Sequence, residues 1–596
     1  MITKRLAALR NEMQKNRIKA YLIPTADFHQ SEYVGEYFKC RAYMTGFTGS
    51  AGTALVMPDR ALLWTDGRYF IQAEKQLQGS GVELFKMGEE GVPTIAEFLK
   101  NYLEAGDVLG FDGRVIDSRQ GEEYEKNAKE KGASVAWNQD LVDAVWADRP
   151  NLSCRPAWSL DVAYVGVSRE EKLERVRAAM KEAGANSHVI TSLDDLAWLF
   201  NLRGDDVACN PVVLSYAIVT EEECTLFVQG AAISEELREE LRVAGVKVRE
   251  YDEFYPAVSS FSEGAAVLLD MNKVSYALVK NLKDGVKVIN RQNPSVLMKA
   301  IKSPVEADNM RKAHIKDGVA MTRFIYWIKK NVGKIPMDEY SVGIKLEEFR
   351  REQEGFIENS FEPVCAYGAN AAQCHYSASE DNCAVIEPKG FFLCDSGGQY
   401  YEGTTDITRT VAVGELTEEE KLHFTLVLKG MLNLAAAKFL YGCRGINLDY
   451  LARQPLWEKG LDFNHGTGHG VGYLLNVHEA PNGFRWRIVP ERNDSCVLEE
   501  GMITSDEPGI YIEGSHGIRT ENLILCKKAE KNQYGQFMEF EALTMVPIDL
   551  DAVDVTLLSE ADKARLNAYH QDVFEKIAPH LNEEEAAWLR EATRPV

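Results

Sequence analysis

The first half of the chain contains an internal repeat, and this feature constrains the fold more than any other. Residues 5–23 align without a gap with residues 172–190, and residues 53–65 align with residues 216–228 at nearly the same spacing. Matched apolar positions in the first block are Leu6, Leu9, Met13 and Leu22 with Leu173, Val176, Met180 and Val189. Chance matching of short apolar patterns fits poorly with two ordered blocks. Two tandem domains of related fold are therefore predicted.

Each copy of the repeat has the same order of patterns. An amphipathic helix is followed by a buried strand and then by a polar turn inside a β-hairpin. Prolines in the segment 145–158 mark a linker after the first copy, and Asn293-Pro294 marks the end of the second. The sequence therefore predicts an α/β (α+β) chain with domains at 1–155, 156–302 and 303–596.

The third domain has no copy of the repeat. Ser303 and Pro304 suit the first turn of a long helix, and Gly333 suits its end. The last forty or so residues are typical of two helices separated at Pro579. All the motifs that suggest chemistry lie in this domain.

Charge and cysteine usage exclude several classes of protein. The formal net charge is −24 and no dense basic run is present, so nucleic acid is not an expected partner. The early residues interrupt their apolar positions with polar ones, and no long uncharged apolar stretch follows. We therefore expect neither a secretory signal nor a membrane span. Eleven scattered cysteines without a CxxC pair suit a reducing compartment, which indicates a cytoplasmic protein.

Two aspartates stand out among apolar, β-rich residues of the segment 391–413. Asp395 ends the first run and Asp406 lies in the second, with a Ser-Gly-Gly-Gln turn expected between the runs. An acidic residue is out of place in such a strand unless it is paired or bound to metal. Taken alone, the pair could also be two exposed strand carboxylates.

Three of the eleven histidines gather in one glycine-rich segment, as His465, His469 and His478. Four interleaved glycines exclude a helix there and would let the backbone approach a ligand closely. Neither GxGxxG nor GxxxxGK[ST] is present, so a phosphate-binding loop is not favoured.

Two glutamates complete the set: Glu507 before a Pro-Gly turn, and Glu521 in a later β-rich run. Each alone would be a surface charge, but four carboxylates and one imidazole make an oxygen-rich, thiolate-free set. Such a set suits Mn²⁺, Co²⁺ or Zn²⁺. Because four carboxylates carry too much charge for one divalent ion, we expect two ions and a water activated between them.

Asp395, Asp406, His469, Glu507 and Glu521, in this order, resemble the metal ligands of the pita-bread metallopeptidases. This family includes methionine aminopeptidase, prolidase and Xaa-Pro aminopeptidase. The chain is most similar to its three-domain, cytosolic Xaa-Pro aminopeptidases over nearly its whole length. Segments that carry the likeness are GFTGSAGTALV, LLWTDGRYF, FNLRGDDVACNPVVLSYAIV, CHYSA, HGTGHGVG, NVHEAP, SDEPGIY, GIRTEN and FEALTMVPID.

The resemblance implies two tandem creatinase-N-like α/β domains followed by a pita-bread catalytic domain with a helical tail. It implies that His375 contacts the substrate near the scissile bond, and that His465 and His478 bind the substrate carbonyl and move protons. It also implies that Mn²⁺ is the metal and that the chain forms a homodimer. The substrates would be peptides with proline at position two, from which the first residue is removed.

The expected mechanism uses Glu507 as general base toward a metal-bridging water. His478 or His465 would stabilise the oxyanion, and His375 or Glu507 would protonate the leaving nitrogen. Prolidase, which cleaves only dipeptides, is the alternative within the enzyme class. A metal-free creatinase-like hydrolase would not explain the five ligands. A non-catalytic binding module on the same fold is the alternative from another class.

Overall fold

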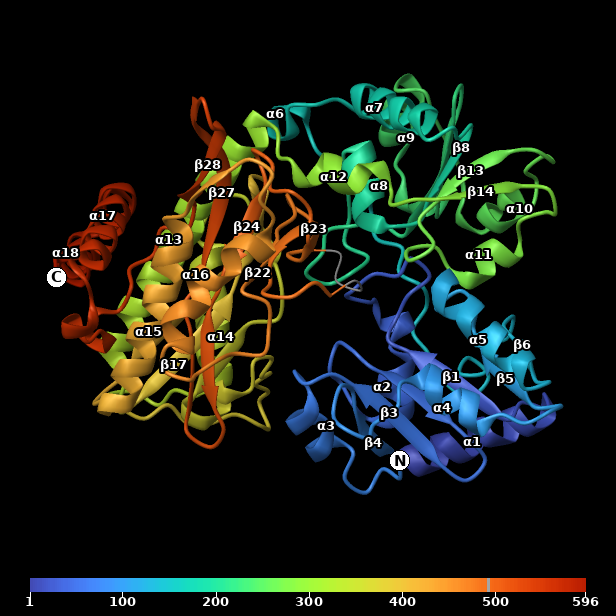
Figure 1. Cartoon of the computed structure of the whole chain (residues 1–596), viewed down its shortest axis with the longest axis horizontal. Coiled ribbons are helices and arrows are strands. Elements are labelled where there is room, and N and C mark those ends of the chain that lie inside the picture. The colour runs from blue at the N-terminus through green and yellow to red at the C-terminus, as the bar shows by residue number, and fades with distance from the viewer. Residues whose placement is uncertain (490–493) are drawn as a thin grey trace. The chain divides into compact units, whose positions relative to one another are not determined.

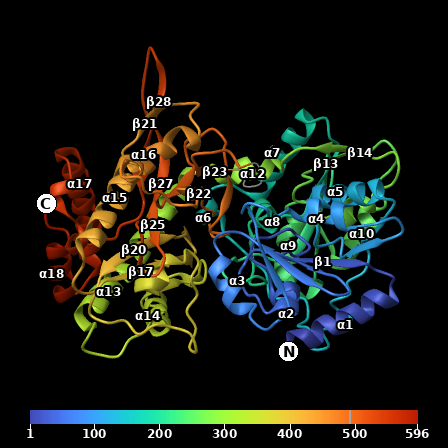
Figure 2. The ribbon, with the colours of Figure 1, turned by 60° about the horizontal axis from the view of Figure 1, so that its bottom comes forward.

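A computed structural model describes residues 1–489 and 494–596. The chain divides into two compact units, shown in Figures 1 and 2. One consists of residues 1–160 and 167–295, and the other of residues 161–166 and 296–596. Among the helices of the described residues, none is long and apolar enough to cross a membrane.

The first unit contains two six-stranded sheets with the same strand order, β4-β3-β2-β1-β5-β6 and β12-β11-β10-β8-β13-β14. In each sheet the second and third strands of the repeat, β2 with β3 and β10 with β11, form an antiparallel hairpin. At one edge a parallel strand follows the hairpin, β4 beside β3 and β12 beside β11. At the other edge two strands are parallel to each other, β5 with β6 and β13 with β14. The first sheet comprises β1 (Ala20–Pro24), β2 (Thr53–Val56), β3 (Ala61–Thr65), β4 (Glu83–Lys86), β5 (Val108–Phe111) and β6 (Ser134–Ala136). The second comprises β8 (Ser187–Ile190), β10 (Ser215–Thr220), β11 (Cys224–Val228), β12 (Val246–Glu250), β13 (Ala266–Leu269) and β14 (Lys287–Asn290).

Register and burial follow the repeat residue by residue. Leu22 lies opposite Leu55 in the first sheet, and their counterparts Val189 and Ile218 lie opposite each other in the second. Helices α1 (Ile2–Lys15) and α7 (Arg169–Glu182) bury the matched apolar positions. The predicted duplication of one α/β fold is confirmed. The other helices of eight or more residues in this unit are α4 (Ile95–Tyr102), α5 (Ser118–Glu130), α8 (Leu193–Phe200) and α9 (Glu235–Val243).

The second unit begins with the predicted long helix, α13 (Pro304–Asn331). Ser303 caps it through a capping box with Glu306, and Gly333 follows its end with a left-handed backbone. A short helix from earlier in the chain, α6 (Val162–Val165), belongs to this unit because Ser303 Oγ donates to the carbonyl of Val165 at 2.8 Å.

Two principal sheets form the body of the second unit. One has the order β16-β17-β20, with β16 (Val364–Tyr367), β17 (Phe391–Ser396) and β20 (Ile407–Ala412). The other has the order β21-β28-β27-β24-β22-β23, with β21 (Lys438–Leu440), β22 (Gly468–Gly470), β23 (Glu479–Phe484), β24 (Ile503–Asp506), β27 (Asn522–Asn532) and β28 (Gly535–Ala542). Smaller sheets are β15 (Phe356–Asn359), β18 (Gly398–Tyr400) and β19 (Gly403–Thr404), and the pair β25 (Gly509–Ile512) and β26 (His516–Arg519).

Helices cover these sheets through separate apolar clusters. Helices α13 and α14 (Glu339–Arg351) pack on β17 and β20 through a core that includes Phe324, Leu346 and Phe392. Helices α15 (Glu418–Ala435) and α16 (Gly445–Trp457) contribute to two further cores. These layers hold the strand ends that carry the site.

The chain ends in two helices, α17 (Glu560–Ile577) and α18 (Glu583–Ala592), separated by a short turn that contains Pro579. They pack against α13 through Val319, Val573 and Leu589, and Figure 1 shows the pair beside that helix. The predicted helical tail is confirmed.

The strand pattern around the two aspartates differs from the prediction. Gly398 and Gln399 of the expected turn belong to strand β18 (Gly398–Tyr400), and Asp406 lies just before β20 instead of inside a strand. The chain leaves one sheet and enters another here, since Thr405 donates to Gly398 in one sheet while Ile407 pairs with Ser396 in the next. Asp406 therefore lies between two strands, and the alternation of side chains along a strand does not decide its direction.

Candidate metal centre

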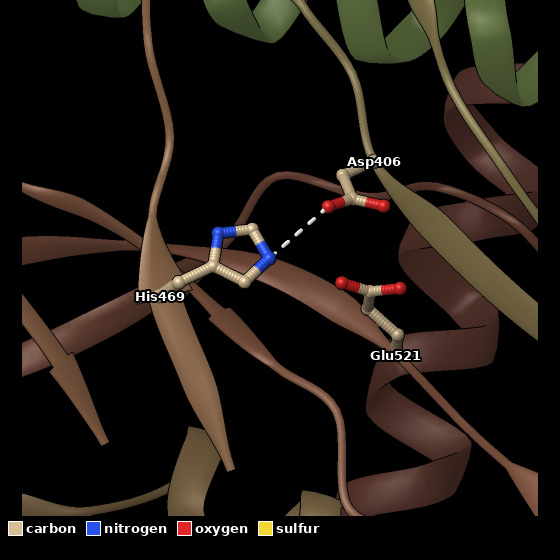
Figure 3. A group of neighbouring side chains, drawn as sticks. All are labelled: Asp406, His469 and Glu521. Atoms are coloured by element: carbon tan, nitrogen blue, oxygen red, sulfur yellow. Dashed lines mark ion pairs between the residues drawn. The ribbon is translucent and has the colours of Figure 1, made fainter. Parts of the chain in front are cut away.

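Three of the predicted ligands meet at one point of the second unit. Ligand atoms of Asp406, His469 and Glu521 all lie within 4.8 Å of one another, as Figure 3 shows. Asp406 precedes β20, His469 is the middle residue of β22, and Glu521 joins β26 to β27. Three elements far apart in sequence therefore bring their side chains to one point.

Hydrogen bonds fix the ring of His469 in the form that a metal ligand needs. Its Nδ1 lies 2.9 Å from the carbonyl oxygen of Gly470, so Nδ1 carries the proton and donates it. Nε2 then points at the carboxylates, 3.4 Å from Asp406 Oδ2 and 3.5 Å from Glu507 Oε1. A backbone acceptor on the far nitrogen is the usual orienting contact of a metal-bound histidine.

Glu521 is held by Thr408 of β20 at two points. Thr408 Oγ1 donates to Glu521 Oε2 at 2.8 Å, and the amide of Glu521 donates to the carbonyl of Thr408 at 3.1 Å. These contacts orient the carboxylate, which lies beside His469 and Asp406.

Asp395, at the end of β17, pairs with a residue that sequence reasoning missed. Arg519 Nη2 donates to Asp395 Oδ2, and Oδ1 of this carboxylate is buried with no hydrogen-bond partner in the described structure. The signal for Arg519 was available, because a buried strand position makes an arginine as conspicuous as an aspartate. A partly satisfied buried carboxylate suits a group that also binds a cation.

The cluster holds more negative than positive charge, because Arg519 and His469 face four carboxylates. Burial raises the pKa of Asp395 despite the opposing charge of Arg519, and it raises the pKa of Glu521 well above its ordinary value. Burial also raises the pKa of Glu507 to about 7, although His469 and Arg519 oppose the rise. For His469, Asp406 and Glu507 overcome the effect of burial and raise the pKa to about 9. Carboxylates crowded in this way are stabilised by bound cations.

The additional histidines occupy different surroundings. His478 stacks edge-on against His469 with ring centroids 4.4 Å apart. His465 lies in the segment that leads to β22, with Nδ1 2.8 Å from the carbonyl of Gly466 and Nε2 2.8 Å from the hydroxyl of Tyr511. Burial and the charge of Arg519 lower the pKa of His465 to about 3, so its imidazole is neutral.

His375 lies in the loop after a short helix at residues 368–372. This helix packs on β26, where the carbonyl of Ala371 occupies the space that a side chain at Gly517 would need. Burial raises the pKa of the neighbouring Cys374 thiol, whereas the charge of Arg519 and a hydrogen bond with Tyr511 oppose this rise. The loop that carries His375 thus runs beside the side chains that hold Asp395 and His465.

The glycines of the histidine segment serve close packing of neighbouring backbone. A Cβ at Gly468 would lie 1.8 Å from the carbonyl oxygen of Ser505, and one at Gly470 would lie 2.3 Å from that of Glu479. Whereas the sequence predicted an approach to a ligand, at these two glycines the close approach is to adjacent strands. It brings β22 against β24 and so brings His469 to Glu507.

A buried ion pair anchors the same segment from helix α16. Arg453 Nε donates to Asp449 at 2.8 Å, and its Nη2 donates to the carbonyl of His465 at 2.7 Å. Asp449 accepts from Thr467 Oγ1 at 2.6 Å, and the carbonyl of Thr467 accepts from the amide of Glu507 at 2.8 Å. This network sets the backbone just before His469 and ties it to the backbone of Glu507.

Comparisons with known proteins agree with this architecture. Models of the creatinase/prolidase N-terminal domain match residues 5–144 and 148–306, that of metallopeptidase family M24 matches residues 308–528, and that of the C-terminal region of peptidase M24 matches residues 536–596. A probable Xaa-Pro aminopeptidase P of Tuber melanosporum is 41% identical over 100% of this chain and 99% of its own.

Two solved structures extend the comparison. An X-prolyl aminopeptidase from Caenorhabditis elegans, described as a cytosolic enzyme with a di-nuclear active site, is 35% identical with a TM-score of 0.94 over 100% of both chains. An Xaa-Pro dipeptidase from Bacillus anthracis is 27% identical with a TM-score of 0.51, and it covers 64% of this chain and 99% of its own.

Proposed function

The chain belongs to metallopeptidase family M24, and we propose that it is an Xaa-Pro aminopeptidase that uses Asp395, Asp406, His469, Glu507 and Glu521 to hold two divalent metal ions. The observation that carries this proposal is the convergence of buried acidic groups on Nε2 of His469. Full-length similarity to Xaa-Pro aminopeptidases supports the substrate class. We retain the domain division at residues 155 and 302 as part of the proposal.

The side chains present fit a pair of divalent ions. The unpaired Oδ1 of Asp395, the oriented Nε2 of His469 and the raised pKa values of Glu507 and Glu521 all describe donors prepared for cations. When bound, such ions lower the pKa of a water and polarise a peptide carbonyl.

Roles for the surrounding residues follow from their positions. Glu507 would accept the proton of the attacking water, because its carboxylate lies at the centre of the cluster, with Oε1 3.5 Å from Nε2 of His469. His478, beside His469, donates a hydrogen bond to the substrate oxygen as negative charge develops. His465 is neutral and held by Tyr511, so it supplies a fixed wall of the site, and His375 is assigned to proton delivery at the leaving nitrogen.

Prolidase is the competing assignment within the family. The prolidase-type structure from Bacillus anthracis matches 64% of the chain, whereas the aminopeptidase from Caenorhabditis elegans matches all of it. Extent of similarity therefore favours an aminopeptidase that accepts peptides longer than two residues.

The test is peptide cleavage with two substrates. Purified chain with Mn²⁺ is incubated with Arg-Pro-Pro and with Gly-Pro, and mass spectrometry follows release of the first residue. Cleavage of the tripeptide, strong inhibition by EDTA and loss in Glu507→Ala are expected. Cleavage of the dipeptide alone would make the protein a prolidase, and no cleavage of either substrate by metal-loaded chain would support a binding module.

Mn²⁺ and a cytoplasmic location are further parts of the proposal. An oxygen-rich set with one imidazole accepts Mn²⁺, and also Co²⁺ or Zn²⁺. All eleven cysteines are free thiols, which suits a reducing compartment, and the relative from Caenorhabditis elegans is a cytosolic enzyme. Metal analysis of protein purified without added metal would identify the ion.

We assign a homodimer to this chain on the basis of an exposed aromatic patch on the second unit. Tyr450 and Trp457 of α16 lie against each other, Trp486 packs edge-on against Trp457, and Ile488 is 60% exposed nearby in sequence. Contiguous exposed apolar groups of this kind mark interaction surfaces. Light scattering should show a dimer for the natural chain and a monomer for Trp486→Asp, and a monomeric natural chain would contradict the assignment.

A further inference from the structure

Arg409, on β20, is fully buried and holds the backbone around one proposed ligand. Its Nη1 donates to the carbonyl oxygen of Glu521 at 2.6 Å and to that of Thr408 at 2.9 Å. Because Thr408 already holds the amide and one carboxylate oxygen of Glu521, Arg409 fixes the remaining backbone polar group of that residue, its carbonyl. Glu521 therefore has no freedom to adjust its backbone.

The other donors of Arg409 reach a loop and the C-terminal helix pair. Nε donates to the carbonyl of Pro547 at 3.2 Å, and Nη2 donates to the carbonyl of Val546 and the hydroxyl of Tyr569, both at 2.9 Å. Tyr569, in the middle of α17, donates in turn to the carbonyl of Val546 at 2.8 Å. One guanidinium thus connects Glu521 to α17.

Among the described residues, the oxygens that accept from Arg409 are carbonyl, amide and hydroxyl oxygens, and none belongs to a carboxylate. A buried cation without an anionic partner costs stability, and an apolar side chain would fill the same space at lower cost. The guanidinium instead fixes the relative positions of several oxygens, because its planar group holds its N–H donors in one geometry.

We propose that Arg409 and Tyr569 are positioning residues for Glu521, through which helix α17 sets the geometry of the metal centre. This inference rests on the proposed function in one respect, which is the assignment of Glu521 as a metal ligand. It gives the C-terminal helix pair a role in the site, although no residue of that pair is a predicted ligand.

The test removes one hydroxyl. Tyr569→Phe keeps the ring, which packs in two apolar cores, and removes one of the acceptors of Arg409. Tyr276→Phe is the matched control, because Tyr276 is a buried tyrosine of the other unit whose hydroxyl donates to Glu125 at 2.8 Å. Both variants and the natural chain are stripped of metal and titrated with Co²⁺, whose visible absorption reports coordination geometry.

Tyr569→Phe should weaken Co²⁺ binding at one of two sites by about five-fold, the effect of one lost hydrogen bond, and should change the absorption bands. Tyr276→Phe should bind and absorb like the natural chain. Tyr569→Phe with the affinity and spectrum of the control would overturn the inference. Because this readout is metal binding, a natural chain that binds two ions but cleaves no peptide would overturn only the proposed function.

Discussion

Burial of Glu507 makes the stability of the metal-free chain depend on pH. Its pKa is about 7 in the folded chain and about 4.5 in an unfolded one. The folded state therefore binds more protons between these values, and its stability is fully present below pH 4.5 and is lost as pH rises through 7. The loss amounts to roughly 3 kcal/mol at most, since each pKa unit corresponds to about 1.4 kcal/mol.

Thermal unfolding in EDTA from pH 5 to pH 8 measures this loss. Glu507→Gln, which resembles the protonated side chain, should equal the natural chain near pH 5 and exceed it in stability at pH 8. Parallel pH profiles for the two proteins would show that Glu507 is ionised equally in the folded and unfolded states, against the account.

His478 should act on the reaction without holding metal. Replacement by alanine should lower kcat at least about 100-fold, the usual contribution of a positioned proton donor, while metal content stays unchanged. Steady-state kinetics and elemental analysis measure the two effects. His580→Ala, at an exposed position on the turn before α18, should behave like the natural chain. Loss of metal from the His478 variant would contradict the assigned role.

At the level of elements, the packing of β22 against β24 decides where His469 lies. Gly468→Ala would place a methyl group 1.8 Å from the carbonyl of Ser505, so the two strands must separate. We expect this variant to lose most of its metal and to unfold at a lower temperature. Gly343→Ala in α14 is the control, because its nearest atom would be Cys365 Sγ at 3.5 Å. Elemental analysis distinguishes them, and full metal content in the Gly468 variant would contradict this explanation.

Helices and strands could be predicted from the sequence where a local pattern of apolar or capping residues is compatible with only one secondary structure. Matched apolar positions such as Leu22 and Val189 fixed the duplicated fold, and Ser303 with Pro304 fixed the start of α13. These patterns did not locate the point near Asp406 where the chain changes sheets, because pairing partners distant in sequence determine that change. Local β-propensity carries no information about which sheet a residue joins.

Prediction of the site succeeded for side chains whose type is out of place in apolar sequence, and the structure gathers Asp406, His469 and Glu521. Residues that act through others were missed. Arg519 pairs with Asp395 across more than a hundred residues, and Arg409 reaches Tyr569 in the tail. The residue type of Arg519 was conspicuous in its apolar strand, but the pairing of either arginine depends on the assembled fold and leaves no spacing signal in the sequence.

For the whole molecule, the division into two compact units predicts separable thermal behaviour. Calorimetry of the metal-free chain should show two transitions. Mn²⁺ at about 100 times its Kd should add about 2.7 kcal/mol for each ion that the unit binds, and should raise only one transition by several degrees. His469→Ala should abolish that shift. A single transition would contradict separable unfolding of the two units, and equal shifts of two transitions would contradict an assignment of the metal centre to the second unit alone.

The central claim is that two metal ions held by the second unit are needed for aminopeptidase activity. The most direct measurement is a titration of metal-stripped chain with Mn²⁺, in which release of arginine from Arg-Pro-Pro is measured at each addition. We expect no release without metal and a plateau once two ions per chain are bound. Release by the stripped chain, or none after two ions are bound, would contradict it.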